Sequence, residues 1–390
     1  SFDYFIRTTD PIHQQFVSEC WSELVKSGQI TKGRYQGFYC TGCEAFKLSG
    51  EIVNECCPIH IRPLEQVEEE NYFFTPDKNS ASKIEAWINR AVWPIGRRQE
   101  AINVLRSAAL ERISISRPSS KNSWGVPVPG DPNQTIYVWF DALLNYLSVE
   151  KITGRKLQPA DIQIIGKDIL KFHAIIYPAL LIALGRQLPE KLLVHGFIQV
   201  DGQKLSKSTG HSVAPQELLA RYAVAGEYAA DAVRYLLFRQ LSFDEDSNFV
   251  WQDFDAIYNG ELANGLGNLV NRTVTLLKRY GKKSVGGAIL TAIEDEDIKP
   301  NLALANADFS GDLESANFEV GQANEWLTRQ KPWEWEAPTP LQLATFIDQC
   351  KLIQISYYLE PFMPVTAKEI RRQLITLEAR PLFPRLPASL

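Results

Sequence analysis

Apolar side chains recur along the first third of the chain with two different periods. Residues 11–30 repeat them every three or four positions, which predicts an amphipathic helix, and residues 80–111 read as a second helical stretch. Residues 113–118 alternate strictly between apolar and polar side chains, which predicts a strand. Between the helices, residues 38–63 are rich in turn-forming residues and lead into an acidic run at 65–70, so we expect a loop-rich lobe there.

The middle of the chain alternates between strand and helix patterns. Residues 135–140 are rich in β-forming side chains and precede a helical stretch at 142–149. Residues 162–165 form a second predicted strand, which is followed by a long helix, and residues 192–194 form a third. Alternation of this kind favours an α/β fold with a parallel sheet covered by helices.

The ends of these strands carry polar and aromatic residues. Trp139 lies near the end of the first strand, Gly166 and Asp168 follow the second, and His195 follows the third. Ligands of such sheets bind at the carboxyl ends of the strands. We therefore expect these residues to border one crevice.

The chain beyond residue 254 is dominated by helical periodicity. One apolar stripe recurs at alternating steps of four and three, at Leu262, Leu266, Leu269, Thr273, Leu276 and Tyr280. Asn268 and Arg272 share a different face of that helix. Two further helices are predicted at residues 313–330 and 341–375, so we expect an all-helical region here.

Composition narrows the class of protein. A chain of 390 residues with 45% hydrophobic and 22% charged residues has the make-up of a folded globular protein with two or three domains. No stretch approaches the roughly 18 to 20 consecutive apolar residues that cross a bilayer, so we expect no membrane span. The formal charge of -5 means that any nucleic-acid contact has to come from a local basic patch.

Four of the six cysteines crowd into one short segment. Cys40-x-x-Cys43, followed by Cys57-x-x-His60, has the spacing of a tetrahedral zinc site with three thiolates and one imidazole. Four protein ligands leave no position for water, so this zinc would be structural. Cys56 is an alternative third thiolate. The competing interpretation is a set of reduced cysteines without a metal.

A glycine-flanked loop carries two lysines three residues apart. The sequence KLSKS occupies residues 204–208, between Gly202 and Gly210. Two ammonium groups so placed can close on a polyphosphate and stabilise the charge that develops on departing pyrophosphate. Lys-x-x-Lys by itself also fits a pair of solvated surface lysines, so the surrounding motifs decide between the two interpretations.

Trp139, Ala142 and Tyr146 are spaced i, i+3 and i+7, which places them on one face of the helix if the strand ends near Trp139. Two aromatic rings around a small residue make a slot for a slender, polarizable side chain, and a thioether gains from such contacts. The competing interpretation is ordinary core packing.

Several motifs together resemble a known family. HGF at residues 195–197, DGQ at 201–203 and KLSKS at 204–208 are similar to the signature loop of class I aminoacyl-tRNA synthetases. YVWFDALLNY at 137–146 and GKDILKFH at 166–173 resemble the methionine-specific members. The cysteine knuckles and the helical tail stand in the same order, so the resemblance covers nearly the whole chain.

This resemblance implies a fold and a domain order. It implies a Rossmann-like parallel sheet, of which this chain holds the second half, with a zinc-knuckle connective insertion and a helical anticodon-binding bundle. The corresponding expectation is an insertion at residues 1–112, the second half of the catalytic domain at 113–210, a stem-contact segment at 211–254 and the anticodon-binding domain at 255–390.

The resemblance also implies a reaction: ATP-dependent activation of L-methionine to methionyl-adenylate, and transfer to tRNA(Met), assisted by Mg²⁺. The expected catalytic residues are Lys204 and Lys207. The residues expected at ATP are His195, Gly166, Asp168, Lys204, Ser206, Lys207 and Ser208. Those expected at methionine are Trp139, Ala142, Tyr146 and His173. The expected anticodon contacts are Asn268, Arg272, Pro332 and Trp333.

The family's His-x-Gly-His-like tetrapeptide is absent from these 390 residues. We therefore expect the chain to be a piece or processed form of a longer protein and to be inactive by itself. Two alternatives remain: another class I synthetase, for example for leucine, valine or cysteine, and a catalytically inactive tRNA-binding paralogue. The expected location is the cytoplasm, with an organellar matrix as the alternative.

Overall fold

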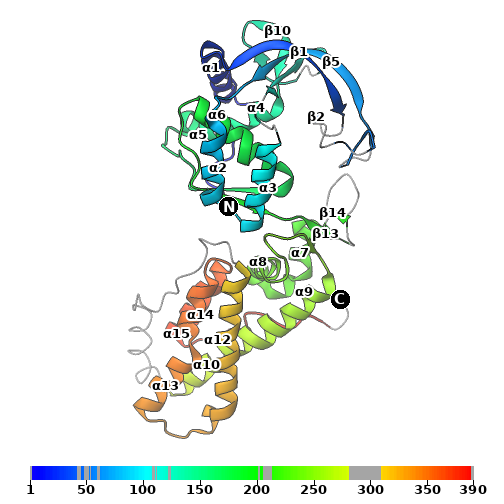
Figure 1. Ribbon diagram of the computed structural model, residues 1–390. Helices are drawn as coiled ribbons and strands as arrows, with labels where there is room; N and C mark the ends of the chain where they lie inside the picture. Colours follow the sequence, from blue (N-terminus) through cyan, green and yellow to red (C-terminus); the bar gives the residue numbers. More distant parts are fainter. Residues whose placement is uncertain are drawn as a thin grey trace. The chain divides into compact units, whose positions relative to one another are not determined.

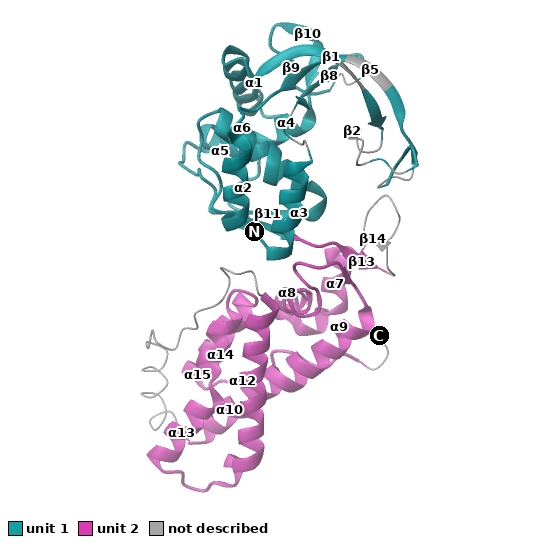
Figure 2. Cartoon of the chain, in the orientation of Figure 1, with its two compact units in different colours: residues 1–194 teal, residues 195–390 magenta. Residues whose placement is uncertain are grey.

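The computed structural model describes residues 2–41, 45–47, 52, 54–58, 62–107, 110, 112–121, 124–200, 203–204, 213–280 and 309–387. The chain forms two compact units, residues 1–194 and residues 195–390 (Figure 2). Within the described ranges, no helix has both the length and the apolar character needed to span a bilayer.

An antiparallel sheet in the order β2-β1-β5-β7 belongs to unit 1. Its strands are β2 (Ala45–Lys47), β1 (Ile30–Cys40), β5 (Glu65–Phe74) and β7 (Ile113–Ser114). β1 pairs with β5 from Ile30 opposite Phe74 to Tyr39 opposite Glu65. The acidic run at residues 65–70 is therefore part of a strand, which follows directly on the segment that the sequence predicts to be rich in turns. Backbone pairing along the whole ribbon outweighs the low strand propensity of glutamate, because strand preference depends strongly on context.

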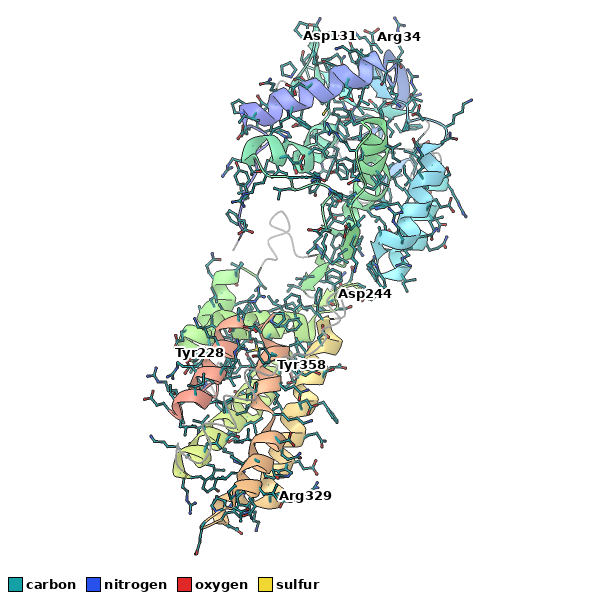
Figure 3. All side chains as sticks on the ribbon, turned by 90° about the vertical axis from the view of Figure 1, so that its left-hand side faces the viewer. Arg34, Asp131, Tyr228, Asp244, Arg329 and Tyr358 are labelled. Atoms are coloured by element: carbon teal, nitrogen blue, oxygen red, sulfur yellow. The ribbon has the colours of Figure 1, made fainter. Side chains whose placement is uncertain are left out.

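Lys32 of β1 connects this sheet to a neighbouring strand. Its ammonium nitrogen lies 3.1 Å from a carboxylate oxygen of Glu70 and 2.8 Å from one of Asp131, which begins β10 (Asp131–Ile136) and is labelled in Figure 3. The hydrogen bond from Lys32 lowers the pKa of Asp131. β10 pairs with β8 (Ser116–Pro118) and β9 (Pro127–Val128) in a second sheet.

A third sheet of unit 1 lies among helices. It has the order β11-β12-β6, with β11 (Ile162–Gly166), β12 (Lys191–His195) and β6 (Val92–Trp93), and β12 pairs parallel to β6. Its buried residues share one hydrophobic cluster with helices α1, α2, α3 and α6. These helices are α1 (Pro11–Lys26), α2 (Ser80–Ala91), α3 (Ile95–Arg106) and α6 (Tyr177–Ala183). The parallel pairing agrees with the α/β expectation.

The helical stretch expected at residues 80–111 is interrupted. It consists of α2, the short strand β6 and α3, which ends at Arg106. Pro94 immediately precedes α3, and a proline inside a helix removes a backbone donor and clashes with the preceding turn. The break allows β6 to enter the parallel sheet beside β12, a pairing that periodicity does not reveal.

The strand expected at residues 135–140 ends early. β10 stops at Ile136, and helix α4 (Val138–Leu143) follows, so Trp139 lies on a helix rather than at a strand end. Phe140 and Leu143 are buried on this helix. An aromatic side chain from the expected strand therefore packs against the core from a short helix, which shows the limit of strand propensity as evidence.

Unit 2 begins with a short sheet in the order β14-β13-β15 and continues with helices (Figure 1). The strands are β13 (Ile198–Val200), β14 (Gln203–Lys204) and β15 (Ser247–Asn248). The first helices are α7 (Pro215–Arg221), η5 (Ala223–Tyr228), α8 (Ala229–Gln240), α9 (Trp251–Ile257), η6 (Tyr258–Gly267) and α10 (Asn268–Tyr280). The later ones are α12 (Phe309–Gln330), η9 (Pro332–Glu334), α13 (Pro340–Cys350), α14 (Leu352–Leu359) and α15 (Pro364–Thr376). Helices dominate the described part beyond residue 254, as expected.

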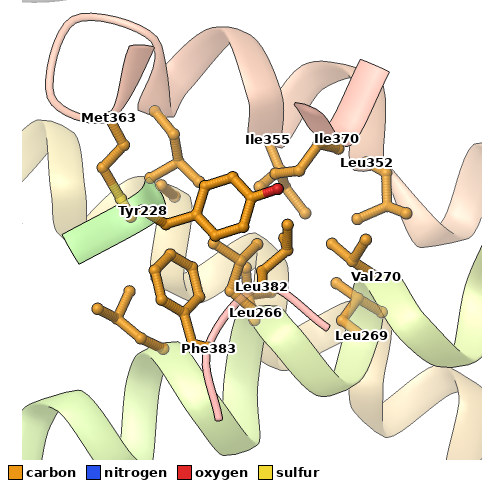
Figure 4. Packing of buried hydrophobic residues seen from close by; sticks show 14 of the residues in the cluster. Tyr228, Leu266, Leu269, Val270, Leu352, Ile355, Met363, Ile370, Leu382 and Phe383 are labelled. Atoms are coloured by element: carbon orange, nitrogen blue, oxygen red, sulfur yellow. The ribbon is translucent and has the colours of Figure 1, made fainter. Parts of the chain in front are cut away.

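The core of unit 2 confirms the predicted apolar stripe. Five of its residues are buried and Tyr280 is partly buried: Leu262, Leu266, Leu269, Thr273 and Leu276. Figure 4 shows Leu266 and Leu269 packed among Ile355, Ile370 and Tyr228. The stripe therefore lies on η6 and α10, which both pack against α12, and α10 also packs against α15.

The single helix expected at residues 341–375 is three helices. α13 ends before Lys351, which has a left-handed backbone conformation with φ 49° and ψ 20°, and α15 starts with Pro364. A left-handed residue ends a helix, and proline is favoured in a first turn, where no backbone donor is required. The breaks let α14 and α15 pack against each other.

The structure divides into two compact units, whereas the sequence predicts four segments. α1, α2 and α3 lie within residues 1–112 and share their hydrophobic cluster with residues 113–194. Residues 211–254 likewise contribute Tyr228, Ala232 and Leu236 to the core of unit 2. The four segments therefore do not have separate hydrophobic cores, and the division into four stays a prediction about their functions.

Candidate functional site

Trp139 meets the helix that carries His173. The ring of Trp139 on α4 stacks on Phe172, with centroids 4.0 Å apart and planes 10° apart. The ring of His173 lies edge-on to that of Trp139, with centroids 6.4 Å apart and ring planes 84° apart. Phe172 and His173 begin η3 (Phe172–Ile176). The sequence motifs identify Trp139 and His173, whereas the stacking of Phe172 follows only from the tertiary arrangement.

Tyr146 reaches the same imidazole from α5 (Asn145–Thr153). Its hydroxyl oxygen lies 3.0 Å from Nε2 of His173, and Nδ1 of that ring lies 3.0 Å from the carbonyl oxygen of Ile169. A carbonyl only accepts, so Nδ1 carries the hydrogen and Nε2 accepts from the Tyr146 hydroxyl. Trp139, Tyr146 and His173 therefore converge, as the family resemblance implies.

Burial sets the protonation of this cluster. His173 is 3% exposed, and its burial lowers the pKa of the imidazole below the usual 6.5. Burial also raises the pKa of the Tyr146 hydroxyl. The cluster is therefore neutral at physiological pH and presents aromatic faces and an uncharged hydrogen-bonded pair, a surface suited to an apolar, polarizable side chain.

The helix that was expected to carry Trp139, Ala142 and Tyr146 is broken. α4 ends at Leu143 and α5 begins at Asn145, so the i, i+3, i+7 spacing does not run along one helix. Ala142 is half-buried on α4. Trp139 and Tyr146 nevertheless meet His173, because η3 packs against α4 and its His173 contacts residues on both sides of the break.

Gly166 and Asp168 stand where the sequence predicts, at the end of a strand. β11 ends at Gly166, and the short helix η2 (Lys167–Ile169) follows at once. Asp168 lies in the first turn of η2, and it is exposed. Its carboxylate can therefore reach a ligand in solvent, and a carboxylate accepts hydrogen bonds from hydroxyl groups well.

His195 ends β12 and precedes a glycine with no room for a side chain. Nδ1 of His195 lies 2.8 Å from the carbonyl oxygen of Gly196, and the His195 ring lies 6.3 Å from that of Phe243. A Cβ on Gly196 would lie 2.2 Å from the carbonyl oxygen of Glu245. This close backbone approach requires glycine and holds the HGF segment against the chain at Glu245.

The lysine loop starts from a hairpin. β13 and β14 pair with Gln199 opposite Lys204 and Val200 opposite Gln203. Ser206, Lys207, Ser208 and the side chain of Lys204 lie outside the described residues. Their roles as catalytic and ATP-binding residues stay predictions, as does the common crevice of Trp139, Asp168 and His195.

Three of the four expected anticodon residues, all in unit 2, lie close together. The guanidinium carbon of Arg272 on α10 lies 5.1 Å from the ring centroid of Trp333 on η9. Nη1 of Arg279 donates to the carbonyl oxygen of Trp333 at 2.8 Å, and the Tyr280 hydroxyl donates to that of Pro332. Trp333 is 38% exposed. The structure thus brings together Arg272, Pro332 and Trp333.

Asn268 lies beside a cavity of about 390 Å³ that the sequence does not indicate. Asn264 and Asn271, at positions i-4 and i+3, line it as well, together with the segment that contains Arg385. Nε of Arg385 donates to the amide oxygen of Asn264 at 2.7 Å. The helical spacing of the three asparagines is a signal that sequence reasoning missed, whereas the position of Arg385 has none.

Two of the expected zinc ligands occupy equivalent positions. Cys40 is the last paired residue before the β1–β2 turn, opposite Ala45, and Cys57 is the last before the turn from β3 (Cys56–Cys57) to β4 (Arg62–Pro63), opposite Arg62. Both are buried, whereas Cys56 is half-buried. Cys43 and His60 lie outside the described residues. Cysteines that end paired strands at two separate hairpins fit a knuckle-type zinc site, which stays a prediction.

Comparisons with known proteins agree with this geometry. The family model described as "tRNA synthetases class I (M)" matches residues 1–66 and 49–274. The "Methionine--tRNA ligase" of Streptomyces coelicolor is 37% identical over 94% of this chain and 72% of its own length. That of Caldanaerobacter subterraneus subsp. tengcongensis is 36% identical over 96% and 60%. The chain therefore spans between about three fifths and three quarters of these relatives.

Solved structures show the same relationship. The crystal structure of Mycobacterium tuberculosis methionyl-tRNA synthetase bound by methionyl-adenylate aligns with a TM-score of 0.80 and 28% identity, covering 99% of this chain and 83% of that one. The free form of the same enzyme aligns with a TM-score of 0.78 and 27% identity, covering 99% and 84%. The sequence motifs, the aromatic cluster and these alignments together show that the chain belongs to the methionine branch of the class I tRNA synthetases.

Proposed function

We propose that this chain is part of a methionine--tRNA ligase, which activates L-methionine with ATP and transfers it to tRNA(Met). The observation that carries the proposal is the convergence of Trp139 and Tyr146 on the neutral imidazole of His173, in a chain whose relatives are named methionine--tRNA ligases. Those names also disfavour a synthetase for leucine, valine or cysteine.

The methionine site consists of Trp139, Ala142, Tyr146 and His173. A thioether against aromatic rings gains about 0.3 to 1.5 kcal/mol per contact, and Ala142 is small and half-buried. A branched side chain is wider at its β-carbon and does not thread such a slot. The neutral state of His173 matters because a charged imidazole loses solvation when an apolar ligand binds beside it. That desolvation costs free energy.

The nucleotide site consists of Gly166, Asp168, His195 and the loop at 204–208. A carboxylate oxygen of methionine attacks the α-phosphorus of ATP, the bond to the bridging oxygen breaks, and pyrophosphate leaves with the electron pair. Lys204 and Lys207 neutralise the charge on that leaving group, and Ser206 and Ser208 donate hydrogen bonds to it. Asp168 accepts from the ribose hydroxyls. Mg²⁺ when bound supplies further neutralisation of the phosphates.

The second step transfers the methionyl group from the adenylate to a terminal ribose hydroxyl of tRNA(Met), and AMP leaves. Neither step requires a protein nucleophile, so binding and orientation account for the catalysis.

The anticodon contacts are Asn268, Arg272, Pro332 and Trp333. The support is the Arg272–Trp333 pair, because unstacked loop bases bind to aromatic faces and guanidinium planes.

Zinc has a structural role in this proposal, held by Cys40, Cys43, Cys57 and His60. The equivalent hairpin positions of Cys40 and Cys57 support these ligands over Cys56.

The proposal keeps the four segments: insertion at 1–112, second half of the Rossmann-like catalytic domain at 113–210, stem contact at 211–254 and anticodon binding at 255–390. The proposed location is the cytoplasm. A relative named "Methionine--tRNA ligase, chloroplastic/mitochondrial" makes an organellar matrix the alternative.

One experiment separates this function from that of an inactive tRNA-binding paralogue. Equilibrium binding of methionine, leucine, valine and cysteine to the chain is measured beside anticodon-dependent tRNA binding. We expect methionine to bind selectively, and no pyrophosphate exchange by the chain alone, because residues 1–390 contain no His-x-Gly-His tetrapeptide. Binding of tRNA without binding of methionine supports the paralogue instead.

A further inference from the structure

A buried histidine outside the aromatic cluster joins the two helices that carry the cluster. His13 on α1 is 0% exposed. Its Nε2 lies 2.7 Å from a carboxylate oxygen of Asp141 on α4, and its Nδ1 lies 2.8 Å from the hydroxyl oxygen of Ser148 on α5. Asp141 and Ser148 are themselves buried, so His13 bonds to two polar groups that are shielded from solvent.

The donors and acceptors follow from the chemistry of each group. A carboxylate only accepts, so Nε2 of His13 donates to Asp141. The Ser148 hydroxyl both donates and accepts, and it also lies 3.2 Å from the carbonyl oxygen of Asn145. His13 therefore makes a directed contact on each side of the break between α4 and α5, which lies at Leu144.

These contacts lie opposite the aromatic ones. Asp141 comes two residues after Trp139, and Ser148 comes two residues after Tyr146. Two residues correspond to about 200° around a helix, so each polar residue is on the far side of its helix from the aromatic one. η3 contacts Trp139 and Tyr146 on one side of α4 and α5, and His13 contacts both helices on the opposite side.

We propose that His13 is a positioning residue for the methionine slot, which it shapes by fixing the angle between α4 and α5. α4 is only six residues long, so little of its own structure resists rotation about Leu144. A rotation there moves Trp139 relative to Tyr146 and changes the width of the slot. The inference rests on the proposed function for the identity of the ligand, and on geometry alone for the rigidity of the two helices.

Two conservative variants and one packing control test this role. His13→Gln keeps a donor for Asp141 and loses the contact to Ser148, whereas His13→Asn keeps a partner for Ser148 and loses Asp141. Val17→Ala is the control, because Val17 is 0% exposed on the same helix α1 and its shortening removes packing alone. If a His13 variant does not fold, Ser148→Ala replaces it, since the His13–Asp141 pair remains.

The first readout is calorimetric binding of methionine and of ATP. We expect both His13 variants to bind methionine about tenfold to a hundredfold more weakly, because small misplacements of binding groups cost on that order, with unchanged ATP affinity. Val17→Ala is expected to lower the melting temperature with unchanged methionine affinity. His13 variants that melt earlier but bind methionine normally overturn the proposal, because His13 then only stabilises the fold.

The second readout needs no ligand. Acrylamide quenching of Trp139 fluorescence, taken as the difference from a Trp139→Phe background, reports how firmly α4 is held. We expect the His13 variants to increase this quenching and Val17→Ala to leave it unchanged. If the unsubstituted protein binds no methionine, the proposed function fails, and the quenching still decides the role of His13: equal quenching in all variants overturns it.

Discussion

The guanidinium of Arg272 lies over the ring of Trp333, with its central carbon 5.1 Å from the ring centroid. The two residues come from α10 and η9, which are far apart in the sequence. Arg279 also donates to the backbone of Trp333 at 2.8 Å, so the tryptophan is held both at its ring and at its backbone. More than a third of the residue remains exposed and accessible to a ligand.

Trp333→Ala is expected to weaken anticodon-dependent binding of tRNA(Met). Loss of one base-stacking ring costs about 1 to 3 kcal/mol of binding, and Arg272 loses its aromatic partner. The measurement is the equilibrium binding of tRNA(Met), compared with that of a transcript with a changed anticodon. Phe318→Ala is the control, since Phe318 is an aromatic residue of unit 2 that is 65% exposed on α12. Equal effects of the two substitutions would refute the stacking role.

Tyr146→Phe is expected to destabilise the aromatic cluster and weaken methionine binding. The substitution removes the donor to Nε2 of His173 and leaves a buried acceptor without a partner, which costs about 1 to 3 kcal/mol. Chemical denaturation and methionine titration measure the two effects. A variant as stable as the original, with the same methionine affinity, would show that this hydrogen bond contributes to neither.

Stability should fall on mild acidification because of His173. Burial lowers its pKa below 6.5 in the folded chain, so the unfolded chain binds a proton that the folded one does not. The stabilisation is present above pH 6.5 and is lost as the pH falls toward the folded pKa, by at most about 1.4 kcal/mol per pH unit. The free energy of unfolding is measured between pH 7 and pH 5.5.

The matched variant for this pH dependence is His173→Gln. Its absolute stability differs, but its slope against pH should be smaller over the same interval, because glutamine does not titrate. The carboxylates with lowered pKa, Asp131 and Glu369, lose their contribution only at more acidic pH. An unchanged slope in the variant would mean that another group titrates.

Protein purified without chelators should contain stoichiometric zinc. Cys40→Ser and Cys57→Ser are expected to abolish zinc binding, because a four-coordinate structural site loses a thiolate in each. Cys56→Ser should retain zinc and serves as the adjacent control. Elemental analysis of the three variants measures the outcome. Zinc loss in Cys56→Ser with retention in Cys57→Ser would assign the third thiolate to Cys56.

Lys207→Ala should slow methionine activation by about two to three orders of magnitude, the usual loss when one preorganised charge-stabilising group is removed. Methionine affinity should not change, since the lysine acts on the departing pyrophosphate. The assay is methionine-dependent exchange of labelled pyrophosphate into ATP, run on a chimera that supplies the family's His-x-Gly-His tetrapeptide upstream of this chain. Lys26→Ala in the same chimera, at the exposed end of α1, is the control. A normal exchange rate excludes this role for Lys207.

Local patterns predicted the parts of the fold in which neighbouring residues supply the decisive contacts. The stripe from Leu262 to Leu276 is buried as expected, because its spacing alone places it on one helix face. The short strands at β11 and β12 also stand where alternation predicts them. The KLSKS motif identified the family, although residues 205–208 lie outside the described part of the chain.

The remaining features depend on residues that are distant in the sequence. The acidic run at 65–70 became a strand because β1 pairs along its whole length, and the break between α4 and α5 has no counterpart in the spacing of Trp139, Ala142 and Tyr146. The sequence by itself determined the family and the residue types of the site. Only the tertiary structure decided that Trp139 and Tyr146 meet at His173, and that His13 joins their two helices on the opposite side. Such contacts form where distant chain segments meet in space, and no local periodicity encodes where they meet.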